Sequence, residues 1–240
     1  MDHKPCESPR YGDRNYWEKR YETEEHKEWL CDYSSVANHL RPLIKSDSRI
    51  LVIGCGNSPF SYELWKDGYR DVISIDYASS VIRNMKEKYP DLTWRQMDMF
   101  KLEFEPKSFS VVIEKATLDA VMDGERDPWN ISDESKFKLD RALTEITRIL
   151  ADDGVFISIS FSQPHFRLPF YAQAHYHWSP IVHTVGDHFH HYVYVMTKGV
   201  PLHESDYLRY LVRTAPSSDR PKSVHLKDDE NFLSHICLTD

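Results

Sequence analysis

The sequence contains few cysteines, and they are not spaced for a zinc site or a disulfide framework. The four are Cys6, Cys31, Cys55 and Cys237, and no two of them form a Cys-x-x-Cys pair. No apolar run approaches the roughly 18 residues of a membrane span. The opening stretch MDHKPCESPRYGDRNYWEKRY has no apolar core of a secretory signal. Because reduced thiols suit the cytosol, we expect a soluble, cytoplasmic protein with no membrane partner.

Basic tracts are also missing. The chain has 30 Lys and Arg against 38 Asp and Glu, which gives a formal net charge of −8. Binding to nucleic acid depends on neutralising phosphates, so we expect no nucleic-acid partner, and a basic protein fits better as a partner. The length of 240 residues and the 40% hydrophobic content predict one large domain, which we expect to be monomeric.

What the sequence does contain is a series of apolar strands that alternate with amphipathic helices. We predict five strands, at residues 49–54, 71–76, 92–98, 109–115 and 155–162. We predict helices between them, at residues 58–66, 79–89 and 137–150. This alternation implies a parallel sheet covered by helices on both faces, and the apolar runs ILVI and VVI agree with it.

The segments outside these five strands are shorter or more polar. Tyr33, Val36, Leu40 and Leu43 form a helical stripe, and HFRLPFYA predicts a short helix. WSPIVHTV and HFHHYVYVMTK predict an antiparallel pair of strands. The first 12 residues are polar, 123–135 are a polar loop and Asp-Asp-Gly at 152–154 is a turn. Residues 204–212 and 231–236 predict short helices joined by a linker at 215–223.

A glycine turn followed by an acid is the most informative pattern in the chain. RILVIGCG, at 49–56, places Gly54 and Gly56 directly after a predicted buried strand, where a residue without Cβ allows a sharp turn and close approach to a ligand. Asp76 ends the next strand, 22 positions after Gly54, where an acid can bind both hydroxyls of a ribose. The pattern predicts an adenosine-containing cofactor; the alternative is an ordinary strand–helix turn with Asp76 as a surface cap.

Two cofactors are compatible with such a turn. A dinucleotide fingerprint needs a third glycine, where the helix faces the pyrophosphate, but Pro59 occupies that position here. S-adenosylmethionine has no phosphate and makes no such demand, and GCGNS resembles the first motif of class I methyltransferases. We therefore favour S-adenosylmethionine over a nicotinamide cofactor.

Two further patterns do not support a site. Tyr194 and Lys198 match the Tyr-x-x-x-Lys pair of short-chain dehydrogenases, but they lie in a predicted strand, which separates such residues by roughly 13 Å. His188 and His190 share one face of that strand while His191 faces away, and no third ligand is evident. We predict no metal.

The whole set of motifs resembles the class I (seven-β-strand) methyltransferase-like family. Within it, the chain is most similar to the elongation factor 1-alpha lysine methyltransferases related to the N-terminal region of endothelin-converting enzyme 2. The matching stretches are YWEKRY, LVIGCGNSPFSYEL, SIDYASSVI, MDM, VVIEKATLDA, GERDPW and PHFR. The resemblance implies a Rossmann-like α/β fold with a mostly parallel seven-stranded sheet and a C-terminal antiparallel hairpin. It also implies an N-terminal aromatic lid and helix over 1–45, a methyltransferase domain over 46–200 and a C-terminal extension over 201–240.

The chain departs from the family pattern at two places. Ala116 stands where the family has Gly, in EKATLDA, and a change there alters a backbone angle beside the site. Asp152-Asp153-Gly154 replaces the Pro-Gly-Gly that precedes strand five in the family, a turn substitution away from the chemistry.

The resemblance implies cofactor-binding residues at the adenosine end. Gly54 should lie beneath the methionine and ribose portions, and Asp76 should bind the ribose hydroxyls with Tyr77 beside the adenine. Asp98 should accept a hydrogen bond from the adenine amino group while Met99 packs or bonds through its backbone. The alternative for Asp98 is a turn residue after strand three.

At the other end of the cofactor, the resemblance places Lys115 near the methionyl group. It also implies that Trp17, Tyr21 and Trp29 fold over the cofactor as the N-terminal lid. The alternatives are a solvated charge for Lys115 and an apolar face packed on the core for the three aromatic residues.

The implied reaction is methyl transfer from S-adenosylmethionine to a lysine of translation elongation factor 1-alpha, with S-adenosyl-L-homocysteine as product. Carboxylates at the pocket mouth would draw in the lysine ammonium; the candidates are Asp119, Glu125 and Asp127, with Trp129 or His165 lining the same mouth. The alternative for these residues is an ordered loop with a helix cap, and no general base is assigned.

Two other functions stay open. The same fold serves methyltransferases for small metabolites or RNA, although Asn-Pro-Pro-Tyr, typical of amide and base methylation, is absent from the end of strand four. A non-catalytic S-adenosylmethionine-binding scaffold is the third interpretation, and retention of the motif acids argues against it.

Overall fold

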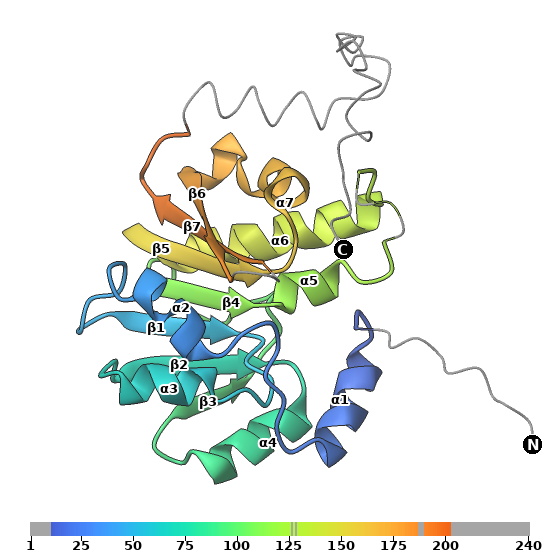
Figure 1. Ribbon diagram of the computed structural model, residues 1–240, viewed down its shortest axis with the longest axis vertical. Helices are drawn as coiled ribbons and strands as arrows, with labels where there is room; N and C mark the ends of the chain where they lie inside the picture. Colours follow the sequence, from blue (N-terminus) through green and yellow to red (C-terminus); the bar gives the residue numbers. More distant parts are fainter. Residues whose placement is uncertain (1–10, 126, 128, 187–189, 203–240) are drawn as a thin grey trace, which may run out of the picture.

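A seven-stranded sheet forms the centre of the molecule (Figure 1). The computed structural model describes residues 11–125, 127, 129–186 and 190–202. The strands are β1 (Arg49–Ile53), β2 (Asp71–Asp76), β3 (Thr93–Gln96), β4 (Phe109–Lys115), β5 (Leu150–Ser160), β6 (Trp178–Val185) and β7 (His191–Lys198). Their order is β3-β2-β1-β4-β5-β7-β6, with parallel pairing up to β5 and antiparallel pairing of β7 with β5 and β6. The predicted parallel sheet with a C-terminal antiparallel hairpin is confirmed.

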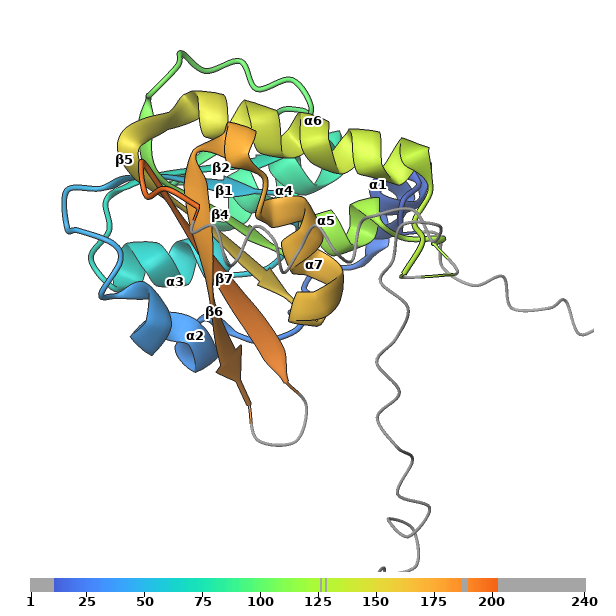
Figure 2. The same ribbon diagram turned by 90° about the horizontal axis from the view of Figure 1, so that it is seen from above.

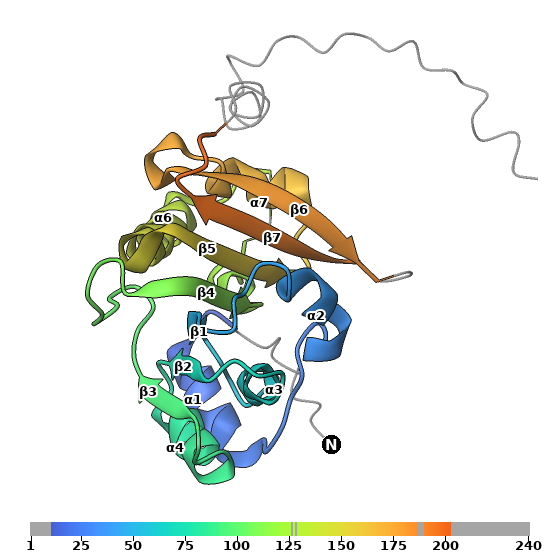
Figure 3. The same cartoon turned by 90° about the vertical axis from the view of Figure 1, so that its left-hand side faces the viewer.

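Helices cover both faces of this sheet, as Figure 3 shows for α2 and α3 on one side and α6 on the other. They are α1 (Arg14–Thr23), α2 (Tyr33–Leu40), α3 (Phe60–Lys66), α4 (Ser79–Lys88), α5 (Thr117–Val121), α6 (Asp133–Ile149) and α7 (Pro164–Tyr171), with a short 3-10 helix at Ala174–Tyr176. The predicted helices at 58–66, 79–89 and 165–172 are confirmed within two residues at each end. Helices α1 and α5 were not predicted.

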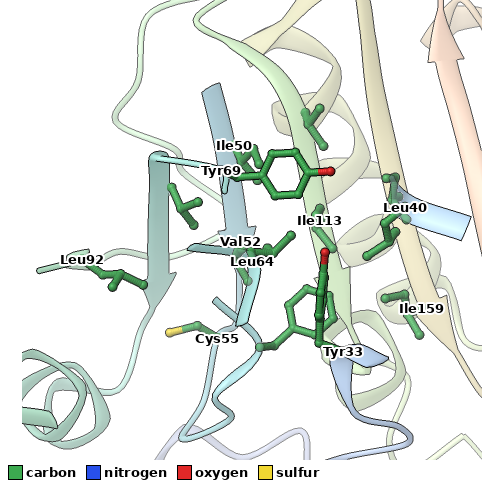
Figure 4. Close-up of a cluster of buried hydrophobic side chains, with 14 of the residues drawn as sticks. Tyr33, Leu40, Ile50, Val52, Cys55, Leu64, Tyr69, Leu92, Ile113 and Ile159 are labelled. Carbon is green, nitrogen blue, oxygen red and sulfur yellow. The ribbon is translucent and has the colours of Figure 1, made fainter. Parts of the chain in front are cut away.

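Alternate residues of the central strands belong to different hydrophobic clusters. Ile50 and Val52 pack with α2, α3 and α4 in the first cluster, part of which is drawn in Figure 4. Leu51 and Ile53 pack with α5, α6 and α7 in the second. Successive side chains of a strand point to opposite faces, so a strand covered on both faces is apolar along most of its length. This explains the runs ILVI and VVI.

Helix α6 begins earlier than the hydrophobic pattern predicts. The side chain of Ser132 accepts a hydrogen bond from the Ser135 backbone N–H at 3.2 Å and caps the helix. Asp133 and Glu134 then lie in the first turn, where the helix dipole favours negative charge. The prediction of a polar loop over the whole of 123–135 is therefore wrong at its C-terminal end.

Strand β5 also begins earlier than predicted. It starts at Leu150, and the register between β4 and β5 shifts between Phe109 and Val111, so Asp152, Asp153 and Gly154 lie within an irregular part of the strand. The prediction of a turn there followed by a strand from 155 is wrong, because pairing with β4 resumes on both sides of the irregularity.

Tyr194 and Lys198 lie on β7, as predicted, and their polar groups bind different partners. The Tyr194 hydroxyl donates to the Ser162 carbonyl at 2.6 Å. The Lys198 ammonium donates to the carbonyls of Thr147 and Leu150 at 2.7 and 2.8 Å. Both groups have structural roles, which agrees with the rejection of a dehydrogenase pair.

Several predictions concern residues outside the described part of the chain. These are the polar start at 1–10, His188 and the predicted segments at 204–212, 215–223 and 231–236. Within the described ranges, no helix has the length and apolar character needed to cross a membrane. The same residues contain no group of three or more His, Cys, Asp or Glu placed to hold a metal ion. The division of the chain at residues 45 and 200 stays a prediction.

Candidate active site

A large cavity lies at the carboxyl ends of β1, β2 and β4, the edge at which open α/β sheets bind ligands. Its volume of about 1200 Å³ exceeds the roughly 300–1,000 Å³ of a typical small-molecule site. Figures 1 and 2 both show α1 and α5 on this side of the molecule. The cavity is lined by all nine predicted cofactor-binding residues: Trp17, Tyr21, Trp29, Gly54, Asp76, Tyr77, Asp98, Met99 and Lys115. The structure thus brings them together, and their roles toward a cofactor stay predictions.

The glycine turn after β1 is closely packed. Gly54 and Gly56 have φ angles of +61° and +51°, which side chains rarely allow. A Cβ on Gly54 would lie 2.9 Å from the Cβ of Thr117 and closer still to its hydroxyl, and a Cβ on Gly56 would lie 3.0 Å from the Tyr21 hydroxyl. Thr117 also donates to the Ile53 carbonyl at 3.1 Å. Sequence reasoning missed Thr117, because its role depends on contact with a turn more than sixty residues away.

Asp76 is fixed to that turn by hydrogen bonds. One carboxylate oxygen accepts the Gly56 N–H at 3.1 Å and the other accepts the Ala78 N–H at 2.9 Å. Burial raises the pKa of Asp76 to about 6, against the opposing effect of the two amide hydrogen bonds. Each carboxylate oxygen retains a further lone pair, so Asp76 can still accept hydrogen bonds from a ligand. The prediction of an exposed surface cap is excluded, since only 6% of the residue is accessible.

Asp98 combines a turn contact with an ion pair. One carboxylate oxygen accepts the Phe100 N–H at 2.9 Å, and the other pairs with Arg14 at 2.8 Å. The Arg14 guanidinium also lies 4.6 Å from the ring centre of Tyr77. Asp98 is therefore a turn residue, as the alternative interpretation predicts. It also lines the cavity. Arg14 lines the cavity but was missed, because no motif of the sequence links it to residues that follow β2 and β3.

Trp17 and Tyr21 line the cavity and also pack on the core. They stack at 5.5 Å between ring centres, lie one helical turn apart on α1 and line the cavity. They are also buried members of the first hydrophobic cluster, and Trp29 packs against it. Helix α1 is held to α4 by Glu18, which accepts hydrogen bonds from the hydroxyl of Ser79 and the N–H of Ser80. The three aromatic residues are thus part of the packed structure, and their role as a lid over a cofactor stays a prediction.

Lys115 ties the segment after α1 to the end of β4. Its ammonium donates to the carbonyls of Trp29 and Cys31 at 2.7 and 3.2 Å and pairs with Glu28. Glu28 in turn accepts the Ser58 hydroxyl at 2.8 Å. Because only 7% of the Lys115 side chain is accessible, the alternative of a solvated charge is wrong.

Three buried polar atoms along the cavity have no hydrogen-bond partner among the described residues. They are Nε1 of Trp29, Oδ1 of Asn57 and Nε of Arg167, and all three residues line the cavity. Buried polar atoms are rarely left unpaired in native proteins. One acceptor and two donors are therefore available to the polar groups of a ligand.

Asp119 lies at the other end of the cavity, in a buried ion pair. It pairs with Arg167, and the same carboxylate oxygen accepts the Ser160 hydroxyl at 2.6 Å. The second oxygen accepts the N–H of Phe161, at 3.4 Å. The side chains of Asp119 and Arg167 are 4% and 3% accessible, so Asp119 is a buried carboxylate rather than one open to solvent. Sequence reasoning missed Arg167, which lies in the matched stretch PHFR.

Trp129 and His165 stack on each other at 5.2 Å between ring centres. Neither belongs to the lining of the cavity, but Phe166, which contacts both rings, does. Glu125 accepts the N–H of Ser132 at 3.0 Å and Asp127 accepts the N–H of Trp129 at 2.9 Å. Glu125 thus supports the start of α6 and also lines the cavity, while Asp127 accepts a bond from a residue two positions on. The roles of both acids toward a substrate, and the place of Trp129 and His165 at the substrate mouth, stay predictions.

Comparison with known proteins shows similarity to methyltransferases in both sequence and fold. Residues 44–208 match a protein family described as a methyltransferase domain. EEF1A lysine methyltransferase 4 of Bos taurus is 41% identical over 236 residues, which cover 95% of this chain and 92% of that protein. The Mus musculus protein of the same name is 40% identical over 242 residues, covering 98% and 95%. Among solved structures, the N-methyltransferase NodS from Bradyrhizobium japonicum, in complex with S-adenosyl-l-homocysteine, shares the fold with a TM-score of 0.56, 14% identity and coverage of 80% of this chain and 99% of that one.

Proposed function

Because this chain belongs to the methyltransferase-domain family, in the group of EEF1A lysine methyltransferase 4, and is an S-adenosylmethionine-dependent methyltransferase, we propose that its substrate is a lysine of translation elongation factor 1-alpha. The observation that carries the proposal is the similarity over nearly the whole chain, which is not confined to the cofactor motifs. The size of the cavity supports it, since there is room for a second reactant beside a cofactor.

The residues of the cavity fit S-adenosylmethionine. Asp76 offers carboxylate lone pairs suited to ribose hydroxyls. Of the unpaired atoms, the acceptor Oδ1 of Asn57 suits the amino group of the methionine portion, and the donor Nε1 of Trp29 suits its carboxylate. We propose that Gly54, Tyr77, Asp98, Met99 and Lys115 complete the site, with Trp17, Tyr21 and Trp29 as its N-terminal lid.

When bound, S-adenosylmethionine supplies an activated methyl group and leaves as S-adenosyl-L-homocysteine. The work of the chain is to hold the two reacting centres close and aligned and to exclude water. A free lysine has a pKa near ~10.4 and arrives protonated. The apolar cavity wall, which includes Ile113 and Phe166, favours its neutral, nucleophilic form. We assign Asp119 to the substrate pocket with Trp129 and His165 at its mouth, and no residue to the role of general base.

The test is methyl transfer in a purified system. The enzyme, methyl-labelled S-adenosylmethionine and intact recombinant elongation factor 1-alpha are incubated, and the product is mapped by mass spectrometry. We expect label on one lysine, lost when that lysine is changed to arginine. Label on RNA or a metabolite but not on the factor would move the function to a different methyltransferase class, and cofactor binding without any transfer would indicate a scaffold.

The cofactor site is tested separately with Asp76→Asn. The amide keeps the shape but removes the charge and one acceptor, and hydrogen bonds to charged groups contribute roughly 1.5–3 kcal/mol each. We expect the Kd for S-adenosylmethionine to rise at least about tenfold in calorimetry. Unchanged affinity would contradict the assignment of Asp76, whatever the protein substrate proves to be.

We also propose that the protein acts in the cytoplasm, as a monomer and without a nucleic-acid partner. The deficit of basic residues supports the last of these three proposals, and a protein substrate needs no nucleic-acid surface.

A further inference from the structure

We propose that the mouth surface, which we define as Trp129, Phe161 and Phe166, is the docking surface for the protein substrate, a folded protein with positive charge around the lysine to be methylated. This inference rests on the proposed function, because it takes the partner to be the polypeptide that carries that lysine. It goes further in assigning the contacts that would select one lysine among many.

Large exposed apolar side chains are few in the described ranges, and two of them lie beside the cavity. Phe161 is 55% exposed and lines the cavity. Trp129 is 58% exposed and meets Phe166, another lining residue, edge to face at 4.8 Å. The other exposed side chains of this kind are Phe137, Ile181 and Val200. Exposed apolar groups beside a site mark interaction surfaces more often than isolated ones do.

The mouth surface is held in place by separate elements. Phe161 follows the end of β5, and its N–H donates to the buried Asp119. Phe166 lies on α7, and Trp129 lies in the loop before α6, where its N–H donates to Asp127 at 2.9 Å. Surfaces whose side chains are already positioned lose little entropy on binding. Large aromatic residues, tryptophan above all, dominate the binding energy of protein interfaces.

The loop that carries Trp129 is acidic, so a partner that binds there should carry positive charge on the facing surface. Residues 123–134 contain one arginine and five carboxylates, at Asp123, Glu125, Asp127, Asp133 and Glu134. Lys136 and Lys138 pair with the last two of these, which still leaves an excess of negative charge. The hydroxyl groups of Ser132 and Ser135 lower the pKa of Glu125, so it stays ionised at neutral pH. An acidic loop that carries one of the exposed aromatic residues complements a basic protein surface.

A docking surface is needed because the cavity alone cannot be selective. The pocket receives only the end of a lysine side chain, which every lysine shares, so discrimination must come from contacts with the surrounding polypeptide. Phe161 meets this need best, since it is exposed at the surface and lines the cavity at the same time. The partner would therefore touch the mouth surface whenever its lysine is in the cavity.

The experiment compares Trp129→Ala and Phe161→Ala with Ile181→Ala. Ile181 is 59% exposed on β6 and does not line the cavity, so it controls for loss of an exposed apolar side chain. Each variant is assayed for methylation of intact elongation factor 1-alpha, for calorimetric binding to it and for binding of S-adenosyl-L-homocysteine. Thermal unfolding checks that each variant is folded.

We expect Trp129→Ala and Phe161→Ala to raise the KM and Kd for the factor at least about tenfold. We expect Ile181→Ala to leave both unchanged, and Trp129→Ala to leave the affinity for S-adenosyl-L-homocysteine unchanged. The surface proposal is overturned if Trp129→Ala binds the factor as well as Ile181→Ala does. It is also overturned if Trp129→Ala loses as much affinity for S-adenosyl-L-homocysteine as for the factor. In both cases, methylation of the factor by the wild type would still support the proposed function. Binding of the factor through the mouth surface without methylation would support the surface proposal and overturn the proposed function. A wild type that does not bind the factor would overturn both.

Discussion

At the scale of single residues, the backbone directly after β4 adopts a conformation that favours glycine. Ala116 has a φ of 61° and a ψ of 4°, the left-handed conformation, directly before α5. Its N–H donates to the Ile159 carbonyl at 2.9 Å, which holds it in place. A residue with a Cβ pays roughly 1–2 kcal/mol in this conformation. The family resemblance implies Gly at this position, and the structure shows that Ala follows a path suited to glycine.

Replacing this alanine by glycine should stabilise the protein. Ala116→Gly removes the left-handed strain but adds flexibility to the unfolded chain, which costs about 0.4–1 kcal/mol. We expect a net gain of up to about 1 kcal/mol in the free energy of unfolding, measured by urea denaturation. Ala142→Gly, inside α6, is the matched control and should lose about 1 kcal/mol or more. A loss of stability in Ala116→Gly would contradict the strain argument.

A second residue-scale prediction concerns the buried Glu114. Its carboxylate accepts the N–H groups of Thr117 and Leu118 and the Ser158 hydroxyl. Burial raises its pKa from the ordinary value of 4.5 to about 7, with the nearby Asp119 adding to the effect. The folded protein therefore holds a proton between these pH values that the unfolded chain has released. This contribution to stability is complete below pH 4.5 and is lost as pH rises through about 7.

Glu114→Gln should remove this dependence, because glutamine keeps a carbonyl acceptor without a titrating charge. We expect the melting temperature of the variant, relative to the wild type, to increase from pH 4.5 to about 7 and then to stay level. Asp76, whose pKa is also raised, is present in both proteins and cancels in the comparison. Parallel melting curves across this range would show that Glu114 does not titrate there.

At the scale of elements, the N-terminal segment is held by buried polar contacts as well as by aromatic packing. Helix α1 is rich in charged residues, yet Trp17 and Tyr21 are buried on one of its faces. The loop after it is fixed by Lys115 at the end of β4 and by Asn57, which donates to the Glu24 carbonyl at 2.9 Å. Asn57 and Lys115, which both line the cavity, thus also hold the N-terminal segment. If the cavity binds the cofactor as proposed, cofactor affinity and the order of this segment should change together.

Lys115→Met tests that coupling. The change leaves Glu28 without its buried counter-charge and the Trp29 and Cys31 carbonyls without their donor. Breaking one side of a buried pair costs about 3 kcal/mol or more. We expect the melting temperature to fall and the Kd for S-adenosylmethionine to rise at least about tenfold.

The control for this prediction is Lys107→Met. Lys107 pairs with Asp152 at 2.7 Å, but the two side chains are 60% and 71% accessible, so solvent screens the interaction. We expect little change in stability or cofactor affinity. Equal effects of the two substitutions would show that the loss of a lysine, rather than of the buried contacts, is responsible.

At the scale of the whole molecule, the net charge of −8 acts on the encounter with the substrate. Complementary charges steer association, and salt screens them over about 10 Å at 0.1 M. If the mouth surface meets a basic protein, kcat/KM for elongation factor 1-alpha should fall as salt rises, mainly through slower association. Stopped-flow binding over a salt series would measure this. A rate that does not depend on salt would exclude electrostatic steering.

The accuracy of the sequence predictions differs between elements for physical reasons. Strands β1, β2 and β4 were located closely, because most of their buried residues are apolar. The start of α6 was missed because its serine cap and first turn are polar. They contain none of the regularly spaced apolar residues by which a helix is distinguished from a loop. Helix α1 was missed because its buried face consists of only two side chains among charged neighbours.

The sequence by itself determined the fold class, and it located the residues that line the cavity at the ends of consecutive strands. The spacing of Gly54 and Asp76 reflects one β-α-β unit, so their common position could be predicted before the structure, while their roles toward a cofactor stay predictions. Only the tertiary structure decided that Asp119 is paired with Arg167, 48 residues away, and that Lys115 binds the loop before α2. Such contacts join segments that are far apart in the sequence, so no local motif predicts them. They form because a buried charge is costly unless it is paired, and the partner can come from any segment that the fold brings close.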